Sequence, residues 1–206
     1  MNQWFGTDGH LQNTFVRVLD MAVLNLCFVI SCIPLVTIGT ALTALHSVNF
    51  KILRQEEGRV SANYWQAFRD NFGQSTKLWL ILLAVGILFA MDFWALSQLE
   101  GSIAWILKTL LGGLLVVYLA MLHYVFAYTA RFSDTLMVSL KNTLMICGAN
   151  LLPTVSLLCI TFLAVFVSLY SFEIFLRAIY IWLVLGFAAL NCLQSFLLNR
   201  VFSRYV

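Results

Sequence analysis

The chain has 206 residues, of which 62% are apolar and 10% are charged, and its mean hydropathy is +0.91. Soluble globular proteins carry about 45–50% apolar and about 25% charged residues, so this composition excludes an ordinary water-soluble enzyme. The net charge of +3 comes without any long run of basic residues, which argues against nucleic acid as a partner. We therefore expect an all-α, polytopic transmembrane helical bundle that forms a single integral membrane domain over residues 1–206.

The first uncharged run, residues 21–50, is too long for one ordinary membrane helix. As a continuous α-helix its 30 residues would extend about 45 Å, whereas the hydrocarbon core of a bilayer is about 30 Å thick. Pro34 and Gly39 lie within this run, and proline cannot continue a hydrogen-bonded helix. The sequence predicts a helical hairpin over residues 14–55 whose turn is at residues 34–39. The alternative is one long span with a kink at the proline.

The longest hydrophilic segment, residues 56–77, is predicted to be a cytoplasmic loop. Within it, residues 61–74 place aromatic side chains on one face of a helix. Such an amphipathic helix should lie flat in the headgroup region of the membrane. Its aromatic face either anchors the protein there or docks a partner, since aromatic and arginine side chains are common interface anchors. The candidate docking residues are Tyr64, Trp65, Phe68, Arg69 and Phe72.

The later apolar runs predict a second hairpin over residues 78–130 and a third over residues 142–199. Together with the first hairpin they give six helical segments. If the first run is instead a single kinked span, there are five.

Loop charges predict the orientation of the chain. In the six-segment interpretation ten Lys and Arg residues share one side of the membrane, and only Lys108 and Arg177 lie on the other. Because Lys and Arg are retained in the cytoplasm, we expect a multi-pass protein of the cell membrane with a cytoplasmic C-terminus. The N-terminus, with a short tail at residues 1–13, is then cytoplasmic too. With five segments the N-terminus moves outside and the counts become nine and three.

Few polar side chains lie inside the predicted membrane segments, and each is a candidate functional residue because burial in lipid is costly. They are Asp20, Asn25, His46, Asp92, His123, Asn150 and Asn191. The candidates that we retain are Asn25, Asp92, His123, Asn150 and Asn191. The three asparagines fit hydrogen bonds between helices. His123 either binds a proton or a ligand, or is satisfied by a neighbouring hydroxyl.

No sequence motif for catalysis or metal binding is present: there is no HExxH, GxSxG, Walker A or CxxC pattern. The five cysteines lie in apolar stretches, where free Cys behaves as a small hydrophobic residue. We therefore expect no enzymatic activity, no cofactor and no metal.

Several segments resemble the YesL-like family of small bacterial integral membrane proteins. They are NLCFVISCIPLVTIG (residues 25–39), TAL (43–45), RQEEG (54–58), AFRDNF (67–72), KNTL (141–144) and NLLP (150–153). The resemblance covers essentially the whole chain, although Thr40 stands where many relatives carry proline after the glycine. It implies a membrane protein of Gram-positive bacteria, often encoded beside genes for carbohydrate uptake and polysaccharide degradation. It implies no assigned activity and no catalytic residue.

Two functions fit these features. The first is a non-enzymatic accessory or partner subunit of a carbohydrate ABC transporter, which contacts the permease and the surrounding membrane lipids. The second is a small transporter or channel that acts alone or as a homo-oligomer. The second requires a polar cavity, which the scarcity of intramembrane charge makes harder to build.

Overall fold

The computed structural model describes residues 6–56 and 58–205, with side chains from residue 15 onward. Within these residues every regular element is a helix. The elements are, in chain order, α1 (Gly6–Ser31), the 3-10 turn η1 (Leu35–Thr37), α2 (Ile38–Leu53), α3 (Val60–Ser97), α4 (Ser102–Arg131), α5 (Leu136–Ala149), α6 (Leu151–Leu169), α7 (Phe172–Ile181), the π-helical turn η2 (Trp182–Gly186) and α8 (Phe187–Phe202). Of the predicted tail at residues 1–13, residues 1–5 lie outside the described residues, and the rest belongs to α1.

Four of the described helices are long and apolar enough to cross a membrane, which agrees with the predicted membrane class. They are α3, α4, α6 and the helix Phe172–Phe202, which comprises α7, η2 and α8. The predicted count of six spanning segments is not confirmed. Helix α2 has 16 residues, ten of them buried, and at 1.5 Å per residue it is only about 24 Å long. It is a central packing helix.

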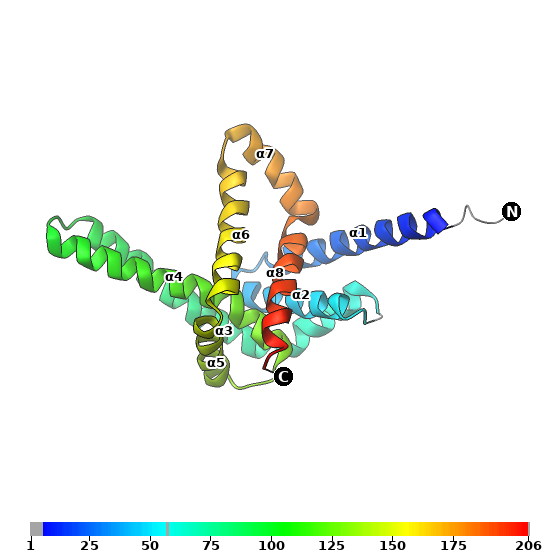
Figure 1. Cartoon of the computed structure of the whole chain (residues 1–206), viewed down its shortest axis with the longest axis horizontal. Coiled ribbons are helices and arrows are strands. Elements are labelled where there is room, and N and C mark those ends of the chain that lie inside the picture. The colour runs from blue at the N-terminus through cyan, green and yellow to red at the C-terminus, as the bar shows by residue number, and fades with distance from the viewer. Residues whose placement is uncertain (1–5, 57, 206) are drawn as a thin grey trace.

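The chain breaks its helix at Pro34, as proline requires, and doubles back (Figure 1). Pro34 is extended, and the Thr37 hydroxyl donates to the carbonyls of Ser31 at 2.6 Å and Pro34 at 2.8 Å. Arg17 of α1 and Gln55, just after α2, line one cavity of about 310 Å³. The middle of α1 therefore lies beside the end of α2, as in a hairpin.

Gly39 has a different role from the one its position in the sequence suggested. It is the second residue of α2, so it does not loosen the turn. A Cβ atom on Gly39 would lie 2.5 Å from the Cβ of Trp79 and 2.8 Å from the Phe126 ring. Small hydroxyl residues continue this contact with α3, because Thr43 and Ser75 share a hydrogen bond of 2.9 Å. Gly39 thus permits close approach of α2 to its neighbours.

Helix α3 is one continuous helix of 38 residues, which corrects the prediction of a separate surface helix at residues 61–74 followed by a span from residue 78. That stretch is helical, but it runs directly into the apolar part of α3. No proline interrupts residues 60–97, and Gly73, where an added Cβ would meet no atom within 4 Å, creates no turn. At 1.5 Å per residue α3 extends about 57 Å, well beyond the hydrocarbon core.

The predicted third hairpin, residues 142–199, is also divided differently. Its first run is interrupted at Asn150, where α5 ends and α6 begins. Pro153 lies in the first turn of α6, where a missing backbone N–H costs little. The hairpin therefore consists of α6 paired with the helix Phe172–Phe202, and α5 is a separate short helix.

The helices pack together at a common base and extend from it as arms (Figure 1). The largest fully buried side chains of the base include Tyr64, Tyr124, Phe126 and Phe202. We call residues 83–119 the α3–α4 arm; Ala104 is its one buried residue. We call residues 158–187 the α6–α8 arm; Ala178 is its one buried residue. In Figure 1 the two arms point in clearly different directions.

The contact at Gly39 makes a stability prediction. Gly39→Ala should lower the free energy of unfolding by about 1–3 kcal/mol, because the added methyl group overpacks a closed contact. Gly112→Ala is the matched control, since a Cβ there meets no atom within 4 Å and alanine favours a helix by up to about 1 kcal/mol. Thermal unfolding in detergent, followed by tryptophan fluorescence, measures both. Equal melting temperatures for the two variants would contradict the proposed role of Gly39.

Candidate functional site

Polar side chains from four helices gather inside the otherwise apolar base. We call this cluster the polar core. Its members are His46 and Asn49 of α2, His123 of α4, Thr161 of α6, and Asn191, Gln194 and Ser195 of α8. It is the main concentration of buried polar side chains that link distant parts of the chain, so it is the candidate functional site.

His46, Asn191 and Ser195 form a closed ring of hydrogen bonds. The Asn191 Nδ2 group lies 3.0 Å from His46 Nε2, and His46 Nδ1 lies 2.8 Å from Ser195 Oγ. Ser195 in turn donates to Asn191 Oδ1 at 3.2 Å. Because the Asn191 amide nitrogen can only donate, His46 Nε2 must accept, and the imidazole proton is on Nδ1. The ring therefore holds a neutral histidine with both ring nitrogens bonded.

Asn49 joins this ring from α2. Its Nδ2 donates to Asn191 Oδ1 at 2.7 Å, so three hydrogen bonds of the polar core link α2 and α8. Its own Oδ1 is buried and has no hydrogen-bond partner among the described residues. Burying an amide oxygen without a partner costs free energy, which makes this the weakest point of the polar core.

A second chain of polar contacts joins α4, α6 and α8. The Thr161 hydroxyl lies 3.3 Å from His123 Nε2 and accepts from Gln194 Nε2 at 2.9 Å. His123 therefore has a neighbouring hydroxyl, which is one of the two roles open to it from the sequence. Gln194 and Ser195 are adjacent on α8, so one turn of that helix serves both parts of the polar core.

The geometry of the polar core favours structural clamping over chemistry. A serine beside a histidine is an arrangement used for nucleophilic catalysis. Here, however, Ser195 is 0% exposed and His46 is 3% exposed, so no substrate can reach the hydroxyl without a rearrangement of the helices. Among the described residues there is also no group of three or more His, Cys, Asp or Glu side chains that could hold a metal ion. The arrangement can fix the relative positions of α2, α4, α6 and α8.

Asn25 forms a separate polar clamp between α1 and the π-helical turn η2. A π-helical turn shifts the backbone hydrogen-bond pattern and leaves groups that need other partners. The fully buried Asn25 donates from Nδ2 to the carbonyls of Trp182 at 2.9 Å and Leu183 at 2.7 Å. Its Oδ1 accepts from the Ala188 N–H at 2.9 Å. One asparagine thus satisfies three backbone groups and attaches α1 to the last hairpin.

The predicted docking residues do not share one exposed surface. Tyr64 is wrong as a contact residue, because its side chain is 0% exposed and packs in the core between α2 and α3. Phe68 packs partly against the same core, and its ring lies 5.7 Å from that of Phe72. Trp65, Arg69 and Phe72 are exposed. Tyr64 and Phe68 lie on the face of α3 that packs against the core, whereas Trp65, Arg69 and Phe72 lie outside that face.

The other predicted polar residues lie apart from the polar core. Asp92 is exposed on the α3–α4 arm and makes no hydrogen bond or ion pair among the described side chains. Asn150 is at the joint between α5 and α6, where it donates to the Ile146 carbonyl at 3.0 Å and to the Tyr205 hydroxyl at 2.8 Å. Of the five candidates, only His123 and Asn191 belong to the polar core.

Sequence analysis missed most of the polar core, although a signal was present. His46 is among the intramembrane polar residues but not among the retained candidates. His46 and Asn49 are three residues apart, and Asn191 and Ser195 are four apart. Both spacings put the two side chains on one helical face. Two such polar pairs within apolar helices predict a shared buried contact, but not which helices meet.

Residues 21–93 match the profile of a family described as "Protein of unknown function, DUF624". YesL-like proteins carry this domain, so the match agrees with the resemblance over that part of the chain. It includes Asn25, the break at Pro34, all of α2 and most of α3, and it ends before α4. No curated protein and no solved structure matches the chain.

The shared hydrogen bond between Asn49 and Asn191 predicts energetic coupling. Asn191→Leu should destabilise the protein by about 1–3 kcal/mol, because it leaves the buried His46 Nε2 and Asn49 Nδ2 atoms without their partner. The double variant with Asn49→Leu should cost clearly less than the sum of the two single variants, with a coupling of about 0.5–3 kcal/mol. Urea unfolding in detergent micelles measures all three. Asn71→Leu is the control partner, since Asn71 bonds only within its own helix, to the Ala67 carbonyl. Strict additivity of Asn49→Leu and Asn191→Leu would contradict the polar core as a single unit.

Proposed function

We propose that this protein is a non-enzymatic integral membrane subunit that binds another integral membrane protein, namely the permease of a carbohydrate ABC importer. The choice of a membrane partner comes from the exposed arms, and the choice of a carbohydrate permease comes from the resemblance to YesL-like proteins. One observation carries most of the proposal: apart from the contacts of the α6–α8 arm with α1 at η2 and with the polar core at Thr161, the two arms pack little against the rest of the chain.

The exposure of the arms is large even for membrane helices. In the most apolar 18-residue window of α3 only 6% of the residues are buried, and in α6 only 11%. A compact bundle would bury more of each helix, because helix association in lipid depends on van der Waals packing over extended faces. The arms leave these faces free for the helices of another protein.

The α6–α8 arm also has shaped surfaces that side chains of a partner could enter. Two apolar grooves lie between α6 and the final helix, with volumes of about 630 Å³ and 530 Å³. Trp182 and Ser168 line both grooves, so these lie on either side of the same contact. Closely fitting apolar side chains from a partner helix would gain dispersion contacts there that disordered lipid chains supply less well.

The polar core supports the non-transport part of the proposal. A transporter or channel needs a polar path that water, ions or sugar can occupy. The side chains of the polar core bond mainly to one another, and the residues of the His46 ring are at most 4% exposed. The grooves of the α6–α8 arm are almost entirely apolar instead.

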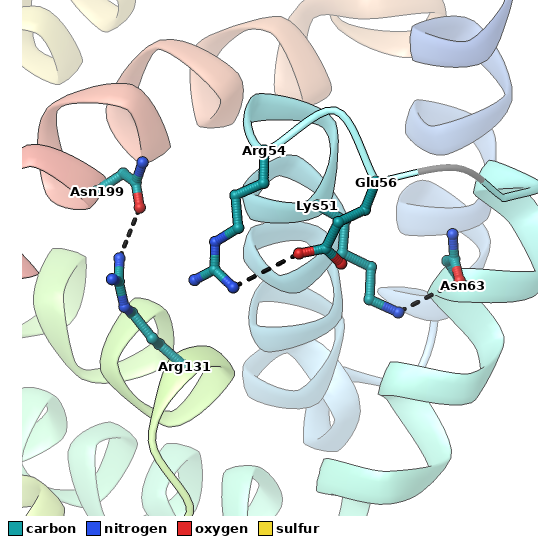
Figure 2. A network of polar contacts seen from close by, with 6 residues as sticks. All are labelled: Lys51, Arg54, Glu56, Asn63, Arg131 and Asn199. Atoms are coloured by element: carbon teal, nitrogen blue, oxygen red, sulfur yellow. Dashed lines mark hydrogen bonds and ion pairs between the residues drawn. The ribbon is translucent and has the colours of Figure 1, made fainter. Parts of the chain in front are cut away.

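The arrangement of basic residues supports a cytoplasmic C-terminus. Arg54 after α2, Arg131 at the end of α4 and Asn199 near the end of α8 lie close together (Figure 2). The ends of these helices therefore share one side, which carries the cations that the positive-inside rule assigns to the cytoplasm. The hairpin of α1 and α2 would place the beginning of α1 on the same side.

Photo-crosslinking tests the proposed interface. A crosslinking amino acid at Leu114 in the α3–α4 arm, or at Phe162 in the α6–α8 arm, should give a crosslink to a sugar permease in native membranes, because both side chains are exposed there. The same probe at Tyr205, which is about as exposed as Leu114 but lies near the C-terminal end of the chain, should give little. The products are identified by mass spectrometry. Recovery of the protein alone, both after crosslinking and after mild solubilisation, would count against a permanent subunit.

A flux assay addresses the alternative of a small transporter or channel. The purified protein in liposomes should move neither sugars nor small ions above the rate of empty liposomes, because its polar side chains are enclosed. Flux is followed with radiolabelled sugars and with ion-sensitive dyes. Saturable flux that Asn191→Leu abolishes would overturn the accessory function in favour of transport.

A further inference from the structure

Basic side chains converge where the ends of α2, α4 and α8 meet. We call Lys51, Arg54 and Arg131 the basic end. Figure 2 shows the side chains of Arg54 and Arg131 reaching from α2 and α4 into the same region, with Asn199 of α8 beside Arg131. The ends of α2 and α4 thus bring together charges that are far apart in the sequence, and α8 contributes the neutral Asn199.

Neutral amides rather than carboxylates hold two of these cations. Arg131 donates from Nη1 to Asn199 Oδ1 at 2.6 Å, and Lys51 donates to Asn63 Oδ1 at 3.3 Å. The one ion pair among the described side chains joins Arg54 to Glu56 at 3.6 Å, and both side chains are nearly half exposed. Such an exposed pair contributes little. The positive charge of the basic end is therefore largely uncompensated within the described residues.

The side chains of Arg54 and Arg131 enter the same region in Figure 2, and like charges that lie near each other repel. Helix C-termini carry partial negative charge, which favours a cation at each helix end. That effect explains why a basic residue follows α2 and why another ends α4. It does not explain why Asn199 holds the Arg131 side chain in the region that the Arg54 side chain also enters. An anion between the two groups would remove the repulsion.

Apolar side chains adjoin the two arginines in the chain. Leu53 and Phe132, the immediate neighbours of Arg54 and Arg131 in the chain, both pack against the core cluster that contains Phe202. At the basic end, charged side chains therefore lie next to apolar side chains of the core. Phosphate groups of membrane lipids lie at a boundary between charged and apolar groups, and basic pockets between membrane helices bind anionic headgroups.

We infer that Arg54 and Arg131 together bind the phosphate of an anionic phospholipid such as phosphatidylglycerol. Asn199 orients the Arg131 guanidinium group and uses only part of its five N–H donors, so the remaining donors can form paired hydrogen bonds with phosphate oxygens. Leu53 and Phe132 contact the glycerol and the upper part of the acyl chains. This lipid site is independent of the proposed permease partner.

Lipid titration of the delipidated, full-length protein in detergent tests the inference. Phosphatidylglycerol should bind, as measured by native mass spectrometry and by a rise in melting temperature, and phosphatidylcholine should not raise it. Arg54→Gln and Arg131→Gln should each weaken phosphatidylglycerol binding roughly 5-fold, and together roughly 30-fold, as expected for about one kcal/mol per cation. Lys108→Gln and Arg177→Gln are matched controls in the two arms and should change binding by less than about 2-fold.

Three results would overturn the lipid site. They are equal loss of binding in the control variants, equal stabilisation by phosphatidylcholine, and full competition by inorganic phosphate, which would indicate a site for a free anion. If the double Gln variant does not fold, phosphatidylglycerol binding is measured with the variants Arg54→Lys and Arg131→Lys instead. These keep the charge but lose the planar donor pair, so binding should weaken measurably. Unchanged binding in both Lys variants would contradict recognition by the guanidinium groups.

Discussion

Polar groups that lie inside an apolar helical bundle need partners within the protein, because lipid offers none. This constraint explains where the helices of this protein meet. His46 and Asn191 bind each other across α2 and α8, and Asn25 satisfies three backbone groups around the π-helical turn η2. Each contact occurs between segments more than one hundred residues apart in the chain. The polar side chains thus fix which helices form the base, while apolar side chains fill the space between them.

The base and the arms differ in what holds them. In the base, hydrogen bonds and large aromatic side chains such as Tyr124 and Phe202 determine one arrangement. In the arms, apart from the contact of η2 with α1, the paired helices contact mainly each other and leave most of their side chains exposed. A rigid base with exposed arms suits a subunit that binds along the helices of a partner. A lipid bound at the basic end would also fix the depth and orientation of the base in the membrane.

Particular residues show why the sequence could not predict every contact. The aromatic face of residues 61–74 was visible from its helical spacing, but the same spacing describes a surface helix and a helix packed on a neighbour. Tyr64 is buried in a core cluster to which both α1 and α2 contribute side chains, and Gly39 permits the close approach of α2 to α3. The same limit applies to the polar core: His46 and Ser195 are almost 150 residues apart, and no local pattern pairs them.

The amino-acid sequence alone determined the features that depend on local chemistry. The long apolar runs identified the membrane class. The missing backbone N–H of Pro34 predicted the helix break. Tertiary structure alone decided that α2 is a buried central helix, that α3 continues without interruption through its amphipathic part, and that four helices share one polar core. The physical reason is that hydropathy and helix breakers act within a few residues. Burial and hydrogen bonding between helices depend instead on which distant surfaces come together.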